Sequence, residues 1–142
     1  MTTLVLLHAL PFDSGMFAGQ TNALEGVANL LTPDLPGFGV ESAIPGITVD
    51  AVADMIATML DRSDIDRAVV GGVSMGGYVA MAIARRHPER VSGLILADTR
   101  AEPDDDASKA NRLKAMETVQ TGGVSALVEA QLPKILSPST QK

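Results

Sequence analysis

The chain has 142 residues, of which 46% are hydrophobic, so it can bury the core of about one globular domain. Its formal net charge is −6, and outside Arg85, Arg86 and Arg90 no stretch concentrates lysine and arginine, which argues against a nucleic-acid partner. The absence of cysteine excludes disulfides and thiolate metal sites, and no apolar run reaches the roughly 18 residues of a membrane span. We therefore expect a cytoplasmic protein with no bound metal and no membrane partner.

Apolar patterns predict alternating strands and helices over the first hundred residues. In chain order they are a strand at 3–9, a helix at 17–26, a weaker strand at 28–32, a helix at 49–60, a strand at 67–73, a helix at 77–87 and a strand at 91–97. The three stronger strands are apolar on both faces, as buried parallel strands are. The alternation predicts an α/β fold, a mostly parallel sheet with helices on both faces.

The pattern changes after residue 101. The acidic run 104–106 opens a predicted helix, which the glycine pair 122–123 breaks, and a further short helix runs to Leu132. We therefore divide the chain into residues 1–100, an α/β core, and residues 101–142, an incomplete helical cap-like segment packed over the sheet.

The motif that carries chemistry lies between the strand at 67–73 and the helix that follows. The segment reads RAVVGGVSMGG, so Gly72, Ser74 and Gly76 satisfy the pattern GxSxG. A side chain at position 72 or 76 would clash across an abrupt strand-to-helix turn, and the turn holds the Ser74 hydroxyl clear of the backbone. We predict that Ser74 is a nucleophile at this elbow and that the Met75 amide, at the positive end of the helix, stabilises developing negative charge.

Two nucleotide-binding motifs fail at the same turn. A dinucleotide fingerprint needs GxGxxG, but Ser74 occupies the position of the middle glycine. A P-loop needs a lysine followed by serine or threonine, and no lysine follows here. We therefore expect no nucleotide cofactor.

Three segments resemble a known family: LLHALPFDSGMF, TPDLPGFGVES and GGVSMGGYVAMAIARRHPERVSGLILADT. They are similar to the esterase, 3-oxoadipate enol-lactonase and perhydrolase branch of the α/β-hydrolase superfamily, and the likeness runs to Thr99. The resemblance implies that the Leu10 amide pairs with the Met75 amide as an oxyanion hole, although the family has glycine where Ala9 stands. It also implies an enzyme that needs no cofactor and that acts on a small carboxylic ester or lactone through an acyl-Ser74 intermediate.

The residues that should activate Ser74 are missing from the pattern. In this fold an acid and then a histidine follow the serine along the chain. His8 belongs to the predicted oxyanion loop and His87 ends the helix after the elbow, so neither is expected to be the base. Asp98, after the strand at 91–97, is a candidate acid, and a turn-forming or helix-capping aspartate is its other interpretation. The resemblance implies two further strands that carry acid and base, so we expect the N-terminal part of a hydrolase, truncated before the last strands.

Two functions stay open at this point. The full-length parent is expected to be a serine hydrolase, whereas the chain alone is expected to be inactive, because loss of the base typically costs about a million-fold in rate. The alternative is a catalytically incomplete scaffold or assembly subunit. Without a further strand beside it, the strand Val91 to Ala97 is an apolar edge that we expect to pair with a second copy or a complementing chain.

Overall fold

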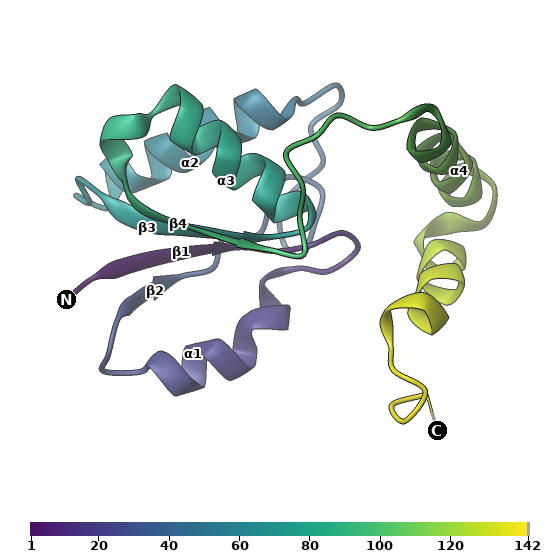
Figure 1. Ribbon diagram of the computed structural model, residues 1–142, viewed down its shortest axis with the longest axis horizontal. Helices are drawn as coiled ribbons and strands as arrows, with labels where there is room; N and C mark the ends of the chain where they lie inside the picture. Colours follow the sequence, from purple (N-terminus) through teal and green to yellow (C-terminus); the bar gives the residue numbers. More distant parts are fainter. Residues whose placement is uncertain (142) are drawn as a thin grey trace. The chain divides into compact units, whose positions relative to one another are not determined.

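A parallel β-sheet lies at the centre of the first part of the chain (Figure 1). The computed structural model describes residues 1–141, and within them four strands form this sheet. They are β1 (Thr3–Leu7), β2 (Asn29–Leu31), β3 (Ala68–Val73) and β4 (Val91–Ala97). Their order in the sheet is β2-β1-β3-β4, and every neighbouring pair is parallel, so β2 and β4 are the edges.

Helices cover both faces of the sheet. The short 3-10 helix η1 (Ser14–Phe17) leads into α1 (Ala18–Leu24), which lies on one face, while α2 (Val49–Arg62) and α3 (Met75–Arg86) lie on the other (Figure 1). A second short 3-10 helix, η2 (Pro88–Arg90), connects α3 to β4. The predicted α/β fold with helices on both faces is confirmed.

The core packs the sheet against α2 and α3. Its fully buried side chains come from β1, β3, α2 and α3, and they include Val5, Leu7, Leu60, Val70 and Ile83. Each large aliphatic side chain contributes roughly 1.5–3 kcal/mol when it is buried in this way. The core therefore holds the ends of β1 and β3 firmly in register, and both predicted site loops begin at those ends.

The edge strand β4 departs from the expected burial. Its apolar sequence predicts a strand that is covered on both faces, yet Leu94, Ile95 and Leu96 are 42–46% exposed. The expected burial is wrong because β4 pairs with β3 alone, and within residues 1–141 no other strand lies along its outer side. The other prediction from the sequence, that this strand is an apolar edge where no further strand lies beside it, is confirmed.

The residues from Glu102 onward form a separate compact unit. Its helix α4 (Asp106–Ile135) is capped by the Asp105 carboxylate, which accepts a hydrogen bond from the Ser108 amide at 2.8 Å. The helix is interrupted at Gly123, whose φ is 74°, as the glycine pair predicts, but its second half ends at Ile135 rather than at Leu132. None of the helices in the described part of the chain combines the length and apolarity that crossing a membrane requires.

Candidate active site

Ser74 lies at an abrupt turn between β3 and α3, and we call residues 72–77 the Ser74 turn. Its φ of 49° and ψ of −110° place a non-glycine residue in a backbone region that L-amino acids avoid. The Ser74 amide donates to the Ala97 carbonyl at 3.0 Å, and the Ser74 carbonyl accepts from the Gly77 amide at 3.0 Å and from the Thr99 hydroxyl at 2.8 Å. Hydrogen bonds to α3, to the end of β4 and to the residue two positions after it thus hold the strained residue in place.

Two glycines make this close packing sterically feasible. A Cβ atom on Gly72 would lie 2.1 Å from the carbonyl oxygen of Gly76. A Cβ atom on Gly76 would lie 2.0 Å from the carbonyl oxygen of Leu7 and 2.8 Å from that of His8. Contacts between uncharged heavy atoms are favourable only at about 3.5–4.0 Å. Neither position therefore accepts a side chain. The second contact also places the start of α3 directly against the loop that follows β1.

Leu10 and Met75 carry the two amides that the sequence predicts as oxyanion donors. Met75 is the first residue of α3, and Leu10 is a partly exposed residue of the loop after β1. Within residues 1–141, neither amide N–H donates to a protein acceptor. Both remain available to an external oxygen atom, and their catalytic role stays a prediction.

His8 is buried, and both of its ring nitrogens face backbone groups. Nε2 accepts a hydrogen bond from the Leu35 amide at 2.9 Å, so the ring proton lies on Nδ1, which faces the Ala9 carbonyl oxygen at 3.2 Å. The Phe38 ring packs against the imidazole edge-to-face, with centroids 5.1 Å apart. His8 therefore shapes the loop and has no nitrogen left to accept a proton from Ser74.

His87 lies at the opposite end of α3 from Ser74. The helix between them has 12 residues, which corresponds to about 18 Å at 1.5 Å per residue. Its Nε2 is 2.7 Å from the Asp54 carboxylate on α2. Neither of the two histidines in the chain is placed to activate Ser74, as the sequence led us to expect.

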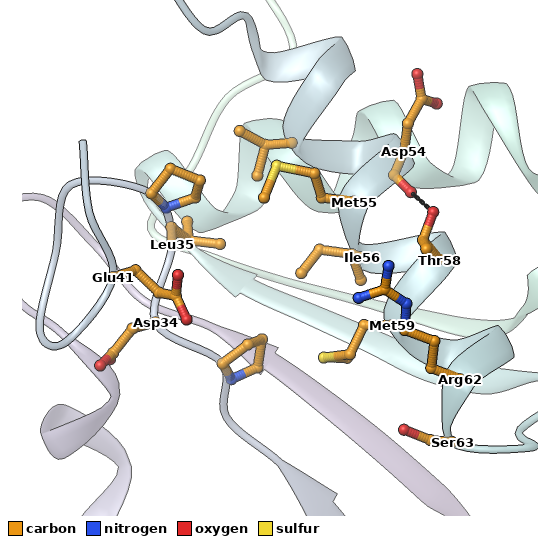
Figure 2. Close-up of a pocket in the computed structure, with 13 residues that line it drawn as sticks. Asp34, Leu35, Glu41, Asp54, Met55, Ile56, Thr58, Met59, Arg62 and Ser63 are labelled. Carbon is orange, nitrogen blue, oxygen red and sulfur yellow. Dashed lines mark hydrogen bonds between the residues drawn. The ribbon is translucent and has the colours of Figure 1, made fainter. Parts of the chain in front are cut away.

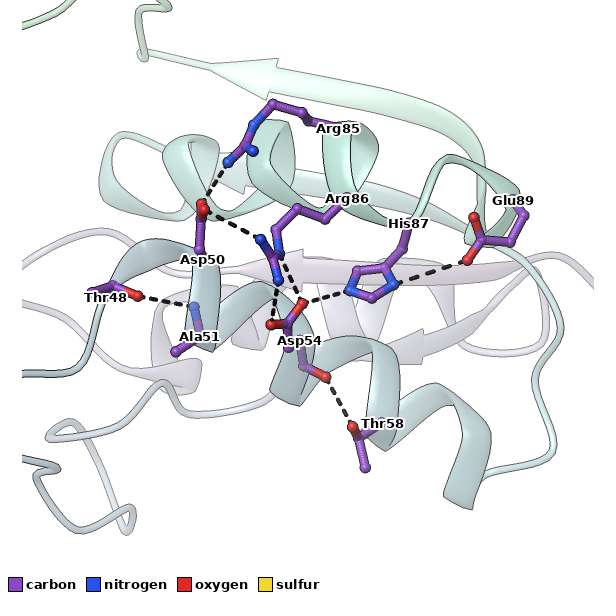
Figure 3. Close-up of polar contacts among 9 residues, drawn as sticks. All are labelled: Thr48, Asp50, Ala51, Asp54, Thr58, Arg85, Arg86, His87 and Glu89. Carbon is purple, nitrogen blue, oxygen red and sulfur yellow. Dashed lines mark hydrogen bonds and ion pairs between the residues drawn. The ribbon is translucent and has the colours of Figure 1, made fainter.

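The same end of α3 carries an ion-pair cluster that the sequence reasoning missed (Figure 3). Arg85 pairs with Asp50 at 2.5 Å and Arg86 with Asp54 at 2.7 Å. The hydrogen bonds from Arg86 and then His87 lower the pKa of Asp54 to about 2. The signal in the sequence is the spacing of two aspartates by four residues on α2. The cluster joins α2 to α3, and it neutralises arginines that would otherwise form a small basic patch.

Asp98 follows β4 directly and is exposed, with a φ of 45°. Its two neighbours, Ala97 and Thr99, make the hydrogen bonds that hold the Ser74 backbone. Asp98 is therefore next to the Ser74 turn, on the apolar edge of the sheet. Its role as a catalytic acid stays a prediction, because both histidines of the chain are bonded to other groups.

A cavity of about 540 Å³ lies between the loop after β2 and helix α2, and Ser74 is not among the residues that line it (Figure 2). Leu35, Met55 and Met59 give it an apolar lining, and Glu41 and Arg62 reach toward it from opposite sides (Figure 2). None of the predicted site residues lines it. Among residues 1–141, no three histidine, aspartate or glutamate side chains are arranged to hold a metal ion.

Comparison with known proteins identifies relatives of the whole first unit. The family model described as the alpha/beta hydrolase fold matches residues 2–121. The chain is 37% identical over 95 residues to the pimeloyl-[acyl-carrier protein] methyl ester esterase of Chromobacterium violaceum, a match that covers 67% of this chain and 36% of that protein. It is 36% identical over 100 residues to a 2-hydroxy-6-oxononadienedioate/2-hydroxy-6-oxononatrienedioate hydrolase of Paraburkholderia phymatum, with 66% and 35% covered.

Solved structures agree with these sequence matches. A thermophilic esterase from Thermogutta terrifontis has a TM-score of 0.92 and 38% identity, over 99% of this chain and 53% of that one. The enol-lactonase from Burkholderia xenovorans LB400 has a TM-score of 0.87 and 30% identity, over 99% and 53%. The chain thus spans about a third of these curated relatives and about half of these solved structures. Esterase and enol-lactonase are the branch that the sequence resembles, so that resemblance is confirmed.

Proposed function

The chain belongs to the alpha/beta hydrolase fold family, and the relatives described above are named as esterases, a hydrolase and an enol-lactonase; on this premise we propose that the whole protein is a serine hydrolase. Its substrate is a small carboxylic ester or lactone, and the reaction passes through an acyl-Ser74 intermediate. The protein needs no cofactor for this reaction and works in the cytoplasm.

The geometry of the Ser74 turn carries this proposal. A serine held at φ 49° between a strand and a helix, with glycines at 72 and 76, is the arrangement expected of a nucleophile elbow. Strain of this kind typically costs about 1–3 kcal/mol and persists at sites where it serves a function. The amides of Leu10 and Met75, which have no protein acceptor within residues 1–141, fit the two donors of an oxyanion hole.

The proposed reaction has two halves. The Ser74 oxygen attacks the substrate carbonyl carbon, the hydroxyl proton passes to a base, and the resulting oxyanion is held by the Leu10 and Met75 amides. The alcohol leaves with a proton, and water then hydrolyses the acyl-serine by the reverse route. Each oxyanion donor is typically worth roughly 3 kcal/mol of barrier.

The base has to come from elsewhere than the two histidines of this chain. His8 is committed to the backbone of two loops, and His87 to the ion-pair cluster at the far end of α3. We therefore propose that a further segment or a second chain supplies the histidine, with Asp98 as a candidate for the acid that orients it. The 142 residues alone are then expected to show no turnover.

Chemical rescue tests the assignment of Ser74. The chain is incubated with a fluorophosphonate probe with and without free imidazole, and intact mass and peptide mapping locate the label. We expect imidazole to accelerate labelling at Ser74, and Ser74→Ala to abolish it. Ser92→Ala, an exposed serine on β4, is the matched control. If the label lands elsewhere, or if Ser74→Ala labels like the native chain, then Ser74 is not the nucleophile.

The exposed edge of β4 favours a second candidate function, that of an assembly subunit. Leu94, Ile95 and Leu96 present an apolar strand whose outer backbone groups pair with nothing in residues 1–141. Such an edge is a template for another strand, from a second copy or from a complementing chain. We expect sedimentation velocity to show association that Leu94→Lys weakens and Leu113→Lys, an exposed leucine on α4, does not. A monomer at every concentration would contradict this function.

A further inference from the structure

Two hydrogen bonds fasten the loop after β1 to the loop after β2, and a third closes the loop after β2 on itself. Oδ1 of Asp34 accepts from the Ser14 amide at 2.8 Å, and Oδ2 accepts from the Val40 amide at 3.0 Å. The other bond between the two loops runs from the Leu35 amide to Nε2 of His8, at 2.9 Å. We call these five residues the loop clasp.

The carboxylate of Asp34 is the centre of the loop clasp. The amides of Val40 and Ser14 lower its pKa, so Asp34 is ionised and makes two charge-assisted hydrogen bonds near neutral pH. Gly39, with a φ of 54°, allows the Val40 amide to approach, because a Cβ atom there would lie 2.0 Å from Oδ2 of Asp34. The two loops are therefore built around this one side chain.

Leu10 lies within the segment that the loop clasp holds. His8 precedes Leu10 and is bonded to Leu35, and Ser14 follows it and is bonded to Asp34. On the other side, the His8 carbonyl packs against Gly76 at the start of α3. The backbone around Leu10 is thus fixed between the Ser74 turn and the loop after β2.

We propose that Asp34 is a positioning residue for the oxyanion hole. The Val40 amide holds its carboxylate in place, and by accepting from the Ser14 amide the carboxylate fixes the backbone of residues 9–14 and so the direction of the Leu10 N–H relative to Ser74. The inference rests on the proposed role of Leu10 as an oxyanion donor. Asp34 itself touches no reacting atom, and its effect passes entirely through the loop.

Two substitutions release the loop clasp in different ways. Asp34→Asn keeps the shape of the side chain, but its NH₂ group has to face one of the two donor amides. Ser14→Pro removes one N–H and leaves the charge of Asp34 intact. Proline suits this position, because Ser14 is the first residue of η1 and Asp13 before it is extended, with φ −128° and ψ −168°.

A matched control lies in the same loop. The carboxylate of Asp13 accepts from the Gly15 amide at 2.8 Å, two residues away, and so does not reach the loop after β2. Asp13→Asn makes the same chemical change as Asp34→Asn without opening the loop clasp. All three variants and the native chain are studied by ¹⁵N relaxation, which reports backbone motion on the picosecond-to-nanosecond scale.

We expect the heteronuclear NOE of the Leu10 amide to fall in Asp34→Asn and in Ser14→Pro, and to match the native value in Asp13→Asn. The rate of Ser74 phosphonylation should fall in the same two variants, by up to about 100-fold, the lower end of the effect of losing an oxyanion donor. A native Leu10 NOE in Ser14→Pro would overturn the inference, even if Asp34→Asn fails to fold. If native Ser74 is not labelled even with free imidazole present, the proposed function fails, while the NOE still decides the role of Asp34.

Discussion

Replacing Gly76 by alanine tests the close packing of the Ser74 turn against β1. The added Cβ would lie 2.0 Å from the carbonyl oxygen of Leu7. Since a comfortable contact needs about 3.5 Å, the start of α3 has to move away from the strand by roughly 1 Å or more. The obstacle is backbone, and no side-chain rotation relieves it.

The expected loss follows from this displacement. Overpacking typically costs about 1–3 kcal/mol, and we take the upper end because β1 is held in the core. The higher helix propensity of alanine returns up to about 1 kcal/mol, which leaves a net loss of about 2 kcal/mol. For a domain of about 100 residues this lowers Tm by roughly 8–16 °C.

Urea unfolding and thermal melting measure this loss, with Gly19→Ala as the matched control. Gly19 lies in α1, and a Cβ atom there meets nothing within 4 Å. The same chemical change should therefore stabilise the protein at this position, by about 0.5–1 kcal/mol. The reasoning is refuted if the free energy of unfolding of Gly76→Ala lies within about 0.5 kcal/mol of the native value, which is the usual range for neutral surface changes.

Three further predictions concern single side chains. Ser74→Gly should be more stable than Ser74→Ala by about 1 kcal/mol in urea unfolding, because only glycine adopts φ 49° and ψ −110° without strain; equal stabilities would show that the turn is relaxed. The pKa of Asp54 is lowered to about 2 in the folded protein, so its carboxylate contributes to stability at pH values above its unfolded pKa of about 3.9. That contribution is lost as the pH falls toward about 2. The Tm of Asp54→Asn should therefore depend less on pH between these limits, and parallel curves for the two proteins would argue against it. His8→Phe leaves the buried Leu35 amide without its acceptor and should lower the free energy of unfolding by about 1–3 kcal/mol in chemical denaturation. An unchanged free energy of unfolding would show that water replaces the imidazole as acceptor.

The Ser74 turn was predictable because its signals are local. Glycines at 72 and 76 mark where backbone crowds backbone, and the strand before them is a continuous apolar run. The start of α3 was predicted at Gly77 but lies at Met75. Glycine lowers helix propensity, so the pattern conceals a helix that the turn itself forces to begin directly after Ser74.

The loop clasp and the ion-pair cluster were not predictable in the same way. Most of their bonds join residues that are 20 or more positions apart, and the remaining one closes a loop on itself. Each bond therefore depends on how the elements pack. Asp34 lies in TPDLPGFGVES, one of the segments that resemble the family, and only the structure shows that its carboxylate joins two loops. The exposure of β4 has a related cause: its apolar sequence indicates a strand, but the neighbouring elements decide whether that strand is covered, so the edge was predictable only from the lack of a further strand.

The bonds around Ser74 also imply an order of events in folding. The turn packs against Leu7 at the end of β1, and hydrogen bonds hold it to Ala97 at the end of β4 and to Thr99 just after it, so β1, β3 and β4 have to be paired before its backbone is fixed. Contacts this distant in sequence form slowly. The strained φ is therefore imposed late, and Ser74→Gly should slow unfolding while the folding rate stays unchanged. Ser74 acquires its geometry only when the sheet around it is already assembled.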